Sequence, residues 1–257
     1  MLIDTHCHLY LEDFETDIIE VIENARSNDV QRFFLPAINS KTTGAMLHLE
    51  ELFPDHCFAM MGLHPCYVKE NYLDELFHVE SWLKKRKFSA IGECGLDFYW
   101  DKSFVKEQYM VLEKQIEWAL EYRLPIILHT RNATQETIDV IKKYKSEQLR
   151  GIFHCFGGSI EEAHQIIELG FYLGIGGVVT YKNGGLDLVL KELELKHIVL
   201  ETDAPYLSPV PFRGKRNESK YLKTIVEKIA AVKNCSFEEI ESITTKNANQ
   251  LFHSTNP

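Results

Sequence analysis

Eight short apolar segments alternate with eight longer amphipathic segments along this 257-residue chain. The apolar segments have the length of β-strands, and the longer ones repeat their apolar residues with the period of an α-helix. This alternation predicts a parallel sheet whose strands are connected by helices. Eight such units in a chain of this size are typical of the (β/α)8 barrel, or TIM barrel. We therefore expect one α/β barrel domain that spans residues 1–257.

The expected boundaries follow from the two kinds of segment. The strands are expected at residues 1–5, 31–38, 57–63, 88–93, 124–129, 151–155, 171–177 and 197–202. The helices are expected at residues 15–28, 41–53, 71–87, 103–122, 133–146, 159–169, 183–194 and 219–232, and a last one at 236–252. The carboxyl-terminal ends of all eight strands converge at one mouth of such a barrel, where the active site lies. Residues at the strand ends should therefore meet in one pocket.

His6 and His8 follow the first apolar run with one residue between them. Side chains in a strand alternate faces with a rise of about 3.3 Å per residue, so these imidazoles should share a face about 6.6 Å apart and could bind one metal ion. Four later apolar runs also end near a metal-binding type of residue, namely Glu93, His129, His154 and Asp203. Buried residues of these types are rare unless they are paired or bind a metal. The six residues therefore predict a metal centre at the mouth.

Six ligands of this kind can hold two divalent ions about 3.5–4 Å apart, which suits the attacking and leaving oxygens of a hydrolysis. We expect one ion on the first histidine pair and Asp203, the other on His129 and His154, and Glu93 as the bridge. Asp203 could also orient the attacking water or accept its proton, so Asp203 and Glu93 are the candidate catalytic residues. This ligand set suits Mg²⁺, Mn²⁺ or Zn²⁺.

Several basic residues lie beside these ligands, although the chain carries a formal charge of −10 that argues against a broad nucleic-acid-coating surface. Arg213, Lys215 and Arg216 follow the eighth strand, a position at which TIM barrels commonly bind phosphate. Arg131 and His64 are two further candidates to bind a substrate phosphate. The alternatives are a solvated loop for the basic run, an ion pair for Arg131 and a turn cap for His64.

Other residues near the strand ends allow both a functional and a structural interpretation. Asp97 and Glu201 could fix histidine nitrogens by hydrogen bonds, as metal sites usually require. Tyr99, Trp100 and Tyr206 could stack on nucleobases, or they could simply pack against the protein.

Composition limits the class of protein. Six cysteines are scattered along the chain without a CxxC pair, which favours reduced thiols and a cytoplasmic protein. The sequence has neither an apolar run of membrane-spanning length nor a signal-peptide pattern. We therefore expect no membrane association, and no feature points to an obligatory protein partner.

Seven successive motifs resemble those of the TatD family of hydrolases, which belongs to the amidohydrolase-like barrel superfamily. The motifs are His6-Cys-His8, Gly62-Leu-His-Pro65, Gly92-Glu-Cys-Gly-Leu-Asp97, Leu128-His-Thr-Arg131, Phe153-His-Cys-Phe-Gly-Gly158, Leu200-Glu-Thr-Asp-Ala-Pro-Tyr206 and Arg213-Gly-Lys-Arg-Asn217. The resemblance implies that the same six residues are metal ligands. It also implies DNA as the substrate, often cleaved from 3′ to 5′ in single strands or at damaged ends. Ser219 and Asn132 depart from the family pattern without touching a ligand.

Two other functions stay open at this point. A barrel hydrolase of a small ester, lactone or amide, or of the aminoacyl-tRNA ester bond, could use the same two-metal site. A non-catalytic protein descended from an enzyme is the third hypothesis, although a degenerate site need not keep six ligands. Arg131 and the basic run distinguish the first two hypotheses, because a phosphodiester needs cationic residues and a neutral lactone does not.

Overall fold

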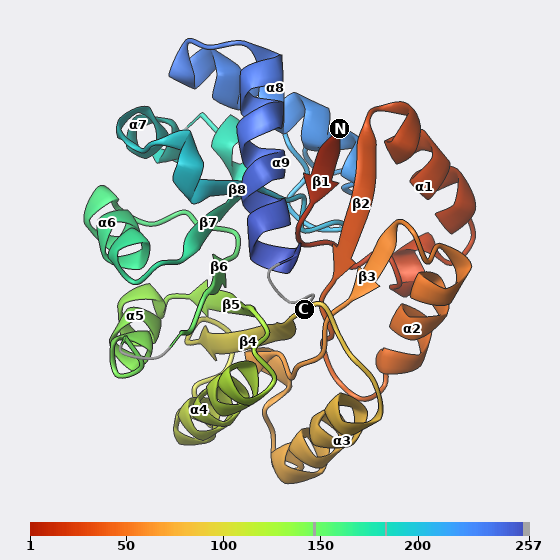
Figure 1. Ribbon diagram of the computed structural model, residues 1–257, viewed down its shortest axis with the longest axis vertical. Helices are drawn as coiled ribbons and strands as arrows, with labels where there is room; N and C mark the ends of the chain where they lie inside the picture. Colours follow the sequence, from red (N-terminus) through yellow and green to blue (C-terminus); the bar gives the residue numbers. More distant parts are fainter. Residues whose placement is uncertain (146–147, 183, 254–257) are drawn as a thin grey trace.

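The computed structural model describes residues 1–145, 148–182 and 184–253. Within these residues, eight parallel strands form a ring, eight α-helices surround it, and a ninth helix crosses one end (Figure 1). The predicted (β/α)8 barrel is confirmed. The predicted helix ends at residues 146 and 183, and the last four residues of the predicted domain, lie outside the described part of the chain.

The observed elements lie close to the predicted ones. The strands are β1 (Leu2–Asp4), β2 (Val30–Leu35), β3 (Cys57–Ala59), β4 (Ile91–Asp97), β5 (Ile126–Arg131), β6 (Gly151–Phe153), β7 (Tyr172–Ile175) and β8 (Ile198–Leu200). The helices are α1 (Ile18–Ser27), α2 (Thr43–Leu52), α3 (Tyr72–Lys85), α4 (Val105–Glu121), α5 (Thr134–Lys142), α6 (Ile160–Glu168), α7 (Leu186–Glu192), α8 (Leu222–Lys233) and α9 (Phe237–His253).

The fourth strand shows the largest shift from its predicted range, because it continues through Gly95 to Asp97. The missing side chain of Gly95 explains this extension. A Cβ there would lie only 2.0 Å from the carbonyl oxygen of His129 on the neighbouring strand β5, and the φ of Gly95 is 142°. Only glycine allows the two strands to stay paired so close to the mouth.

The ring consists of a three-stranded sheet, β1-β2-β3, and a five-stranded sheet, β4 to β8. Backbone hydrogen bonds join the two sheets at both seams. The amide of Thr5, just after β1, donates to the carbonyl of Leu200 in β8 over 3.0 Å, and the amide of Gly92 in β4 donates to the carbonyl of Met61, just after β3, over 3.0 Å. These bonds bring the ends of β1 and β8 together, which places the first and last predicted ligands side by side.

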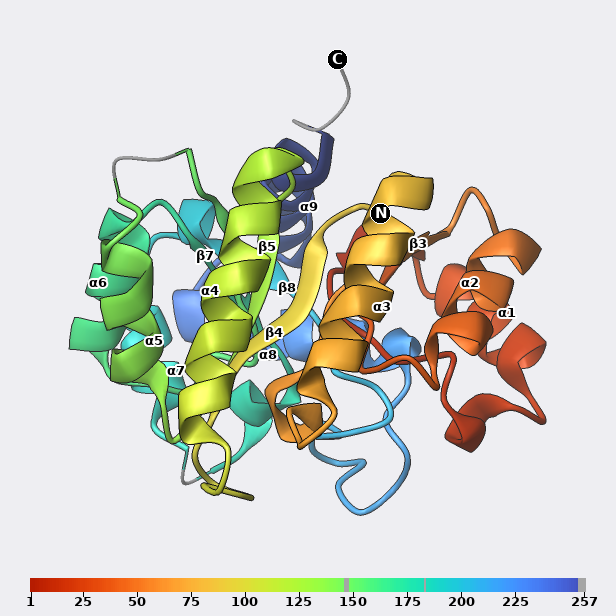
Figure 2. The ribbon, with the colours of Figure 1, turned by 90° about the horizontal axis from the view of Figure 1, so that it is seen from below.

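An apolar layer, called the lower layer below, fills the amino-terminal half of the barrel. It consists of Ile3, Phe34, Met60, Ala90, Ile127, Ile152 and Val199, with Ala248, Leu251 and Phe252 of α9. The rings of Phe34 and Phe252 stack with centroids 3.7 Å apart, so α9 closes this end of the barrel. The loop between β8 and α8 lies at the opposite end (Figure 2).

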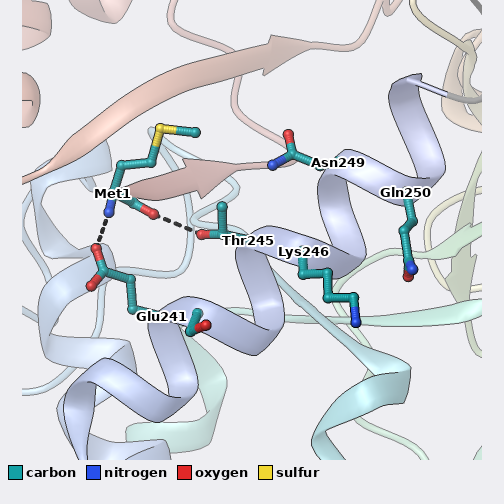
Figure 3. Close-up of a pocket in the computed structure, with 7 residues that line it drawn as sticks. Met1, Glu241, Thr245, Lys246, Asn249 and Gln250 are labelled. Carbon is teal, nitrogen blue, oxygen red and sulfur yellow. Dashed lines mark hydrogen bonds and ion pairs between the residues drawn. The ribbon is translucent and has the colours of Figure 1, made fainter.

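Helix α9 is also fixed to the start of β1 by polar contacts. The amino group of Met1 pairs with Glu241, and the hydroxyl of Thr245 donates to the carbonyl of Met1 over 2.7 Å (Figure 3). These residues line a hollow together with Lys246, Asn249 and Gln250, on the α9 side and away from the mouth. No helix in the described part of the chain is long and apolar enough to cross a membrane.

Candidate metal centre

The six predicted ligands converge at the mouth of the barrel. His6 and His8 lie beyond the end of β1 and not within a strand, because β1 ends at Asp4. Their Nε2 atoms are nevertheless only 3.2 Å apart. His154 directly follows β6 and Asp203 lies shortly after β8. Glu93 and His129 lie within β4 and β5.

Glu93 divides this cluster into two halves. Its Oε2 atom lies 3.2 Å from Nε2 of His6 and 3.4 Å from Nε2 of His8. Its Oε1 atom lies 2.9 Å from Nδ1 of His129 and 3.0 Å from Nε2 of His154. One carboxylate therefore presents an oxygen to each half, as a bridging ligand must.

Asp203 completes the half that contains His6 and His8. Its Oδ1 atom lies 3.6 Å and 3.5 Å from the Nε2 atoms of His6 and His8. The φ of Asp203 is 57°, in the left-handed region that aspartate tolerates better than most residues. In this conformation the amide of Asp203 donates to the carbonyl of His6 over 2.9 Å, which holds the two chain segments together.

Hydrogen bonds hold His8 and His129 by the nitrogen that faces away from Glu93. Nδ1 of His8 lies 3.0 Å from the hydroxyl of Tyr10. Nε2 of His129 lies 2.9 Å from Oδ2 of Asp97. Nδ1 of His154 makes no hydrogen bond among the described residues, although it lies 3.4 Å from Oε1 of Glu201. Metal-binding histidines usually have such partners, because the outer hydrogen bond fixes the ring and leaves the inner lone pair for the ion.

His64 joins the second half of the cluster and also caps a turn. Its Nδ1 accepts a hydrogen bond of 3.0 Å from the amide of Cys66, which caps the 3-10 helix Pro65–Tyr67. Its Nε2 lies 3.3 Å from Oε1 of Glu93. Because Nδ1 accepts, the proton of the neutral ring must be on Nε2. His64 therefore presents an N–H donor to the centre, and not the free lone pair that a metal ligand needs.

The chemistry of this cluster fits divalent cations. Ligand atoms lie within 4.8 Å of one another in three groups, which are His6–His8–Asp203, His6–Glu93–His154 and His64–Glu93–His129. Nδ1 of His6 is buried and has no hydrogen-bond partner among the described residues. A site of imidazole nitrogens and carboxylate oxygens, nearly dry and closely spaced, suits Zn²⁺ and Mn²⁺ and admits Mg²⁺.

Electrostatics in the cluster favour added positive charge. Burial alone would raise the pKa of Glu93, but the surrounding imidazoles prevail and hold this pKa well below its usual value. Burial alone would lower the pKa of His8, but hydrogen bonds with Asp203 and Glu93 prevail and raise it to about 9. The carboxylates thus stay ionised and favour a neighbouring cation, which protons or divalent ions can supply.

Asp4 joins the elements beneath the cluster. This fully buried carboxylate accepts hydrogen bonds from the amide of Thr202 over 3.0 Å, from the hydroxyl of Thr202 over 2.6 Å and from the hydroxyl of Ser219 over 2.6 Å. Burial raises the pKa of Asp4 to about 7. Asp4 therefore holds the segment after β8 in place beside β1. Its partner Thr202 directly precedes Asp203, and Asp4 itself lies two residues before His6.

The predicted phosphate-binding residues separate into two kinds. Arg131, Arg213 and Lys215 are exposed near the mouth. Arg216 instead donates to both carboxylate oxygens of Asp17, over 2.9 Å and 2.6 Å, and to the carbonyl of Asp13 over 2.6 Å. Its fork of donors is therefore used to hold the loop after β8 against the segment before α1, which differs from the phosphate contact predicted for it.

Two residues of the site were not predicted, although the sequence contains a signal for both. Asp4 and Tyr10 extend the same alternation as His6 and His8, because all four are even-numbered in one short segment. The hydroxyl of Tyr10 donates to the carbonyl of Pro36 over 2.5 Å, so it is held in position to accept from His8. An acid and a phenol at this spacing would have marked them as supports of the histidine pair.

Comparisons with known proteins agree with this geometry. The family model described as "TatD related DNase" matches residues 3–253. A relative from Bacillus subtilis (strain 168), described as "Uncharacterized metal-dependent hydrolase YabD", is 43% identical over 254 residues, which cover 98% of this chain and 99% of the relative. A relative from Edwardsiella piscicida, described as "3'-5' ssDNA/RNA exonuclease TatD", is 30% identical over 257 residues, which cover 98% of this chain and 99% of the relative.

A solved structure shares the whole architecture. The crystal structure of YJJV, a TatD homolog from Escherichia coli K12, superposes with a TM-score of 0.92 at 28% sequence identity, and the match covers 98% of each chain. The fold of this chain is therefore that of a TatD homolog of known structure.

Proposed function

The chain belongs to the TatD-related DNase family of metal-dependent hydrolases, and from this premise we propose that it is a deoxyribonuclease that cleaves phosphodiester bonds of DNA from 3′ to 5′. The observation that carries the proposal is the position of Glu93, which presents one carboxylate oxygen to each half of a histidine-rich cluster. A two-cation site of this form suits the attacking and leaving oxygens of a phosphodiester. The exposed Arg131, Arg213 and Lys215 supply the positive charge that an anionic polymer requires.

We assign the residues as follows. His6, His8 and Asp203 would hold one divalent ion, His129 and His154 would hold the other, and Glu93 would bridge them. When bound, the ions supply Lewis acidity, which lowers the pKa of water and offsets charge on the phosphate oxygens. Mg²⁺, Mn²⁺ and Zn²⁺ all match the ligand types.

The side chains around the ions then carry out the remaining steps. Oδ1 of Asp203 faces the two histidines, so we assign Oδ2 of the same carboxylate to accept the proton of the attacking water. The fixed Nε2–H of His64 would donate to a non-bridging phosphate oxygen, and its position beside Oε1 of Glu93 supports this role. Arg131, Arg213 and Lys215 would bind the neighbouring phosphates.

The test is degradation of end-labelled single-stranded DNA by metal-stripped protein, with Mg²⁺, Mn²⁺ or Zn²⁺ added back. The expected result is a ladder that shortens from the 3′ end only when a metal is restored. Asp203→Asn should reduce kcat by roughly 10²- to 10⁴-fold, the range of a general base, while KM changes little. Absence of any cleavage in protein that binds the metals would overturn the proposal.

A small ester, lactone or amide, or the ester bond of aminoacyl-tRNA, is the other class of substrate that such a centre could hydrolyse. The three exposed cationic residues favour the phosphodiester. Neutralising Arg213 and Lys215 together should therefore raise KM for DNA and flatten its dependence on salt concentration. An unchanged KM and salt slope would favour the small neutral substrates.

A further inference from the structure

We propose that Tyr99, Trp100 and Arg131 form a platform at the mouth on which an unpaired nucleobase of the substrate stacks. The inference rests on the proposed nuclease function and adds the residues that would bind an unpaired nucleobase beside the metal centre. These three residues are called the aromatic platform below.

The exposure of the two rings is the first observation. Tyr99 is 52% exposed and Trp100 is 67% exposed, in the loop that directly follows β4. The ring centroids lie 4.9 Å apart at nearly a right angle. Large aromatic side chains normally bury most of their surface, so two adjacent exposed ones at an active-site mouth indicate a surface that binds a flat apolar ligand.

Arg131 adds a positive charge to the same place. Its guanidinium carbon lies 4.0 Å from the ring centroid of Tyr99 and 5.1 Å from that of Trp100. Aromatic rings that stack with bases, combined with arginine that contacts phosphate and stacks in turn, are the usual elements of single-strand binding surfaces. A basic and aromatic cluster therefore fits a nucleotide better than it fits an apolar peptide.

Asp97 fixes the platform relative to the metal centre. Its Oδ1 atom accepts from the amide of Tyr99 over 2.9 Å and from the amide of Trp100 over 3.1 Å. Its Oδ2 atom lies 2.9 Å from Nε2 of His129, a proposed metal ligand. Asp97 is only 1% exposed, so one buried carboxylate holds both the aromatic loop and the ligand. Arg131, the third residue of the aromatic platform, follows His129 by two residues on β5, so its position is also fixed relative to this proposed ligand.

This arrangement selects the form of the substrate. A base within a duplex stacks on its neighbours and has no free face, whereas an unpaired base can stack on a protein ring. The platform should therefore favour single strands and frayed or unpaired ends. Because every base has a π-face, the preference should be for strand form more than for sequence.

The test measures binding of a short single-stranded oligonucleotide with phosphorothioate linkages, which resist hydrolysis, to the Mn²⁺-loaded full chain. Fluorescence anisotropy gives Kd for the unsubstituted protein, Tyr99→Ala, Trp100→Ala and the control Phe77→Ala. Phe77 is 71% exposed on α3, so its removal matches the loss of an exposed ring without touching the platform. Trp100→Ala should weaken binding roughly 5- to 150-fold, the range for loss of one stacked base, and Phe77→Ala should not.

A second arm distinguishes stacking from mere support of the loop. The oligonucleotide carries a baseless tetrahydrofuran nucleotide at each position in turn. One position should weaken binding of the unsubstituted protein as much as Trp100→Ala does, and the same change should have no further effect on Trp100→Ala. Unchanged affinity in both aromatic variants, or losses that add independently, would overturn the inference.

The two proposals can fail separately. If the protein produces a metal-dependent ladder but Tyr99→Ala and Trp100→Ala leave Kd unchanged, the nuclease function is supported and the stacking role is refuted. If the two substitutions weaken binding but no metal restores cleavage, the stacking role is supported and the nuclease function is refuted.

Discussion

Ile152 lies in β6 and His154 directly follows this strand, yet the two residues belong to regions of opposite character. Ile152 is part of the lower layer, which is apolar and closed by α9. His154 is part of the metal centre, where it lies 3.0 Å from Glu93. The same step of two residues leads from Ile127 to His129 on β5, so one face of each strand changes from apolar to polar as it approaches the mouth.

The difference shows how the barrel separates stability from chemistry. Each fully buried valine, isoleucine, methionine, leucine or phenylalanine of the lower layer stabilises the fold by roughly 1.5–3 kcal/mol. The metal centre instead buries ionisable groups, with Glu93 2% exposed and His6 fully buried, and burial of charge costs free energy unless it is paired. The lower layer and the rest of the apolar core therefore offset the free-energy cost of burying these ionisable groups, which bound cations would reduce.

The largest effect is expected from breaking the bridge in the metal centre. Glu93→Gln keeps the size of the side chain but removes the charge that serves both halves. Loss of several kcal/mol of charge stabilisation corresponds to a decrease in kcat of roughly 10³-fold or more. Steady-state cleavage of single-stranded DNA measures it, with Phe77→Ala as the control. A decrease below tenfold would contradict the bridging role.

Substitutions of Ile152 in β6 and of His154 just after it test whether the two regions are separate. Ile152→Ala should reduce the free energy of unfolding by about 2–5 kcal/mol, because it opens a cavity in the lower layer, and should leave metal content unchanged. His154→Ala should lower metal content and change the unfolding of the metal-free protein much less. Urea unfolding in chelator and elemental analysis give the two readouts. Equal effects of both variants on both readouts would show that the two regions are not separate.

Asp97→Asn tests whether Asp97 holds His129 in position to bind a metal. Loss of the carboxylate opposite Nε2 of His129 should weaken metal binding roughly 10- to 100-fold, as is typical for such partners. Trp100→Ala is the matched control, because it removes part of the aromatic platform and keeps the carboxylate. Competition titration with a metal-binding dye measures the affinity. If both variants bind the metal equally well, Asp97 supports only the loop.

A pH dependence of stability originates beneath the metal centre. Burial raises the pKa of Asp4 from 3.8 to about 7, so the folded protein holds this proton more tightly than the unfolded chain does. Asp4 therefore lowers the free energy of unfolding as pH rises from about 4 to about 7, by at most about 1.4 kcal/mol per pH unit. Asp4→Asn should remove this slope.

Urea unfolding of the metal-free protein and of Asp4→Asn across this pH range gives the difference between their slopes. Parallel curves for the two proteins would mean that Asp4 keeps an ordinary pKa in the folded state.

Local patterns were sufficient to predict most of the fold and the place where the candidate ligands meet. Apolar runs and helical periods depend on neighbouring residues, so the order and approximate limits of the elements could be read directly. The convergence of the six candidate ligands could be predicted because each lies in or just after a strand, and the barrel brings strand ends together whatever their separation in sequence. His6 and His8 were predicted to be spaced as in a strand, whereas both lie beyond β1, but this difference did not change which residues they meet.

Contacts between distant segments could not be predicted in the same way. Arg216 pairs with Asp17 across 199 positions of sequence, and no local pattern separates a basic residue bound by such a partner from one that faces a substrate. The end of β4 was missed for a similar reason, because the need for Gly95 arises only from the approach of His129 on the next strand. The donor role of His64 likewise depends on the amide of Cys66 and on a turn whose geometry the residues alone do not specify.

The most direct measurement counts tightly bound Mn²⁺ per chain, by elemental analysis after equilibrium dialysis, in the unsubstituted protein and in Glu93→Gln. The division of the cluster by the two oxygens of Glu93 predicts two ions per chain, and fewer than two in the variant. A single ion in the unsubstituted protein, or two ions retained in Glu93→Gln, would contradict a centre that Glu93 bridges.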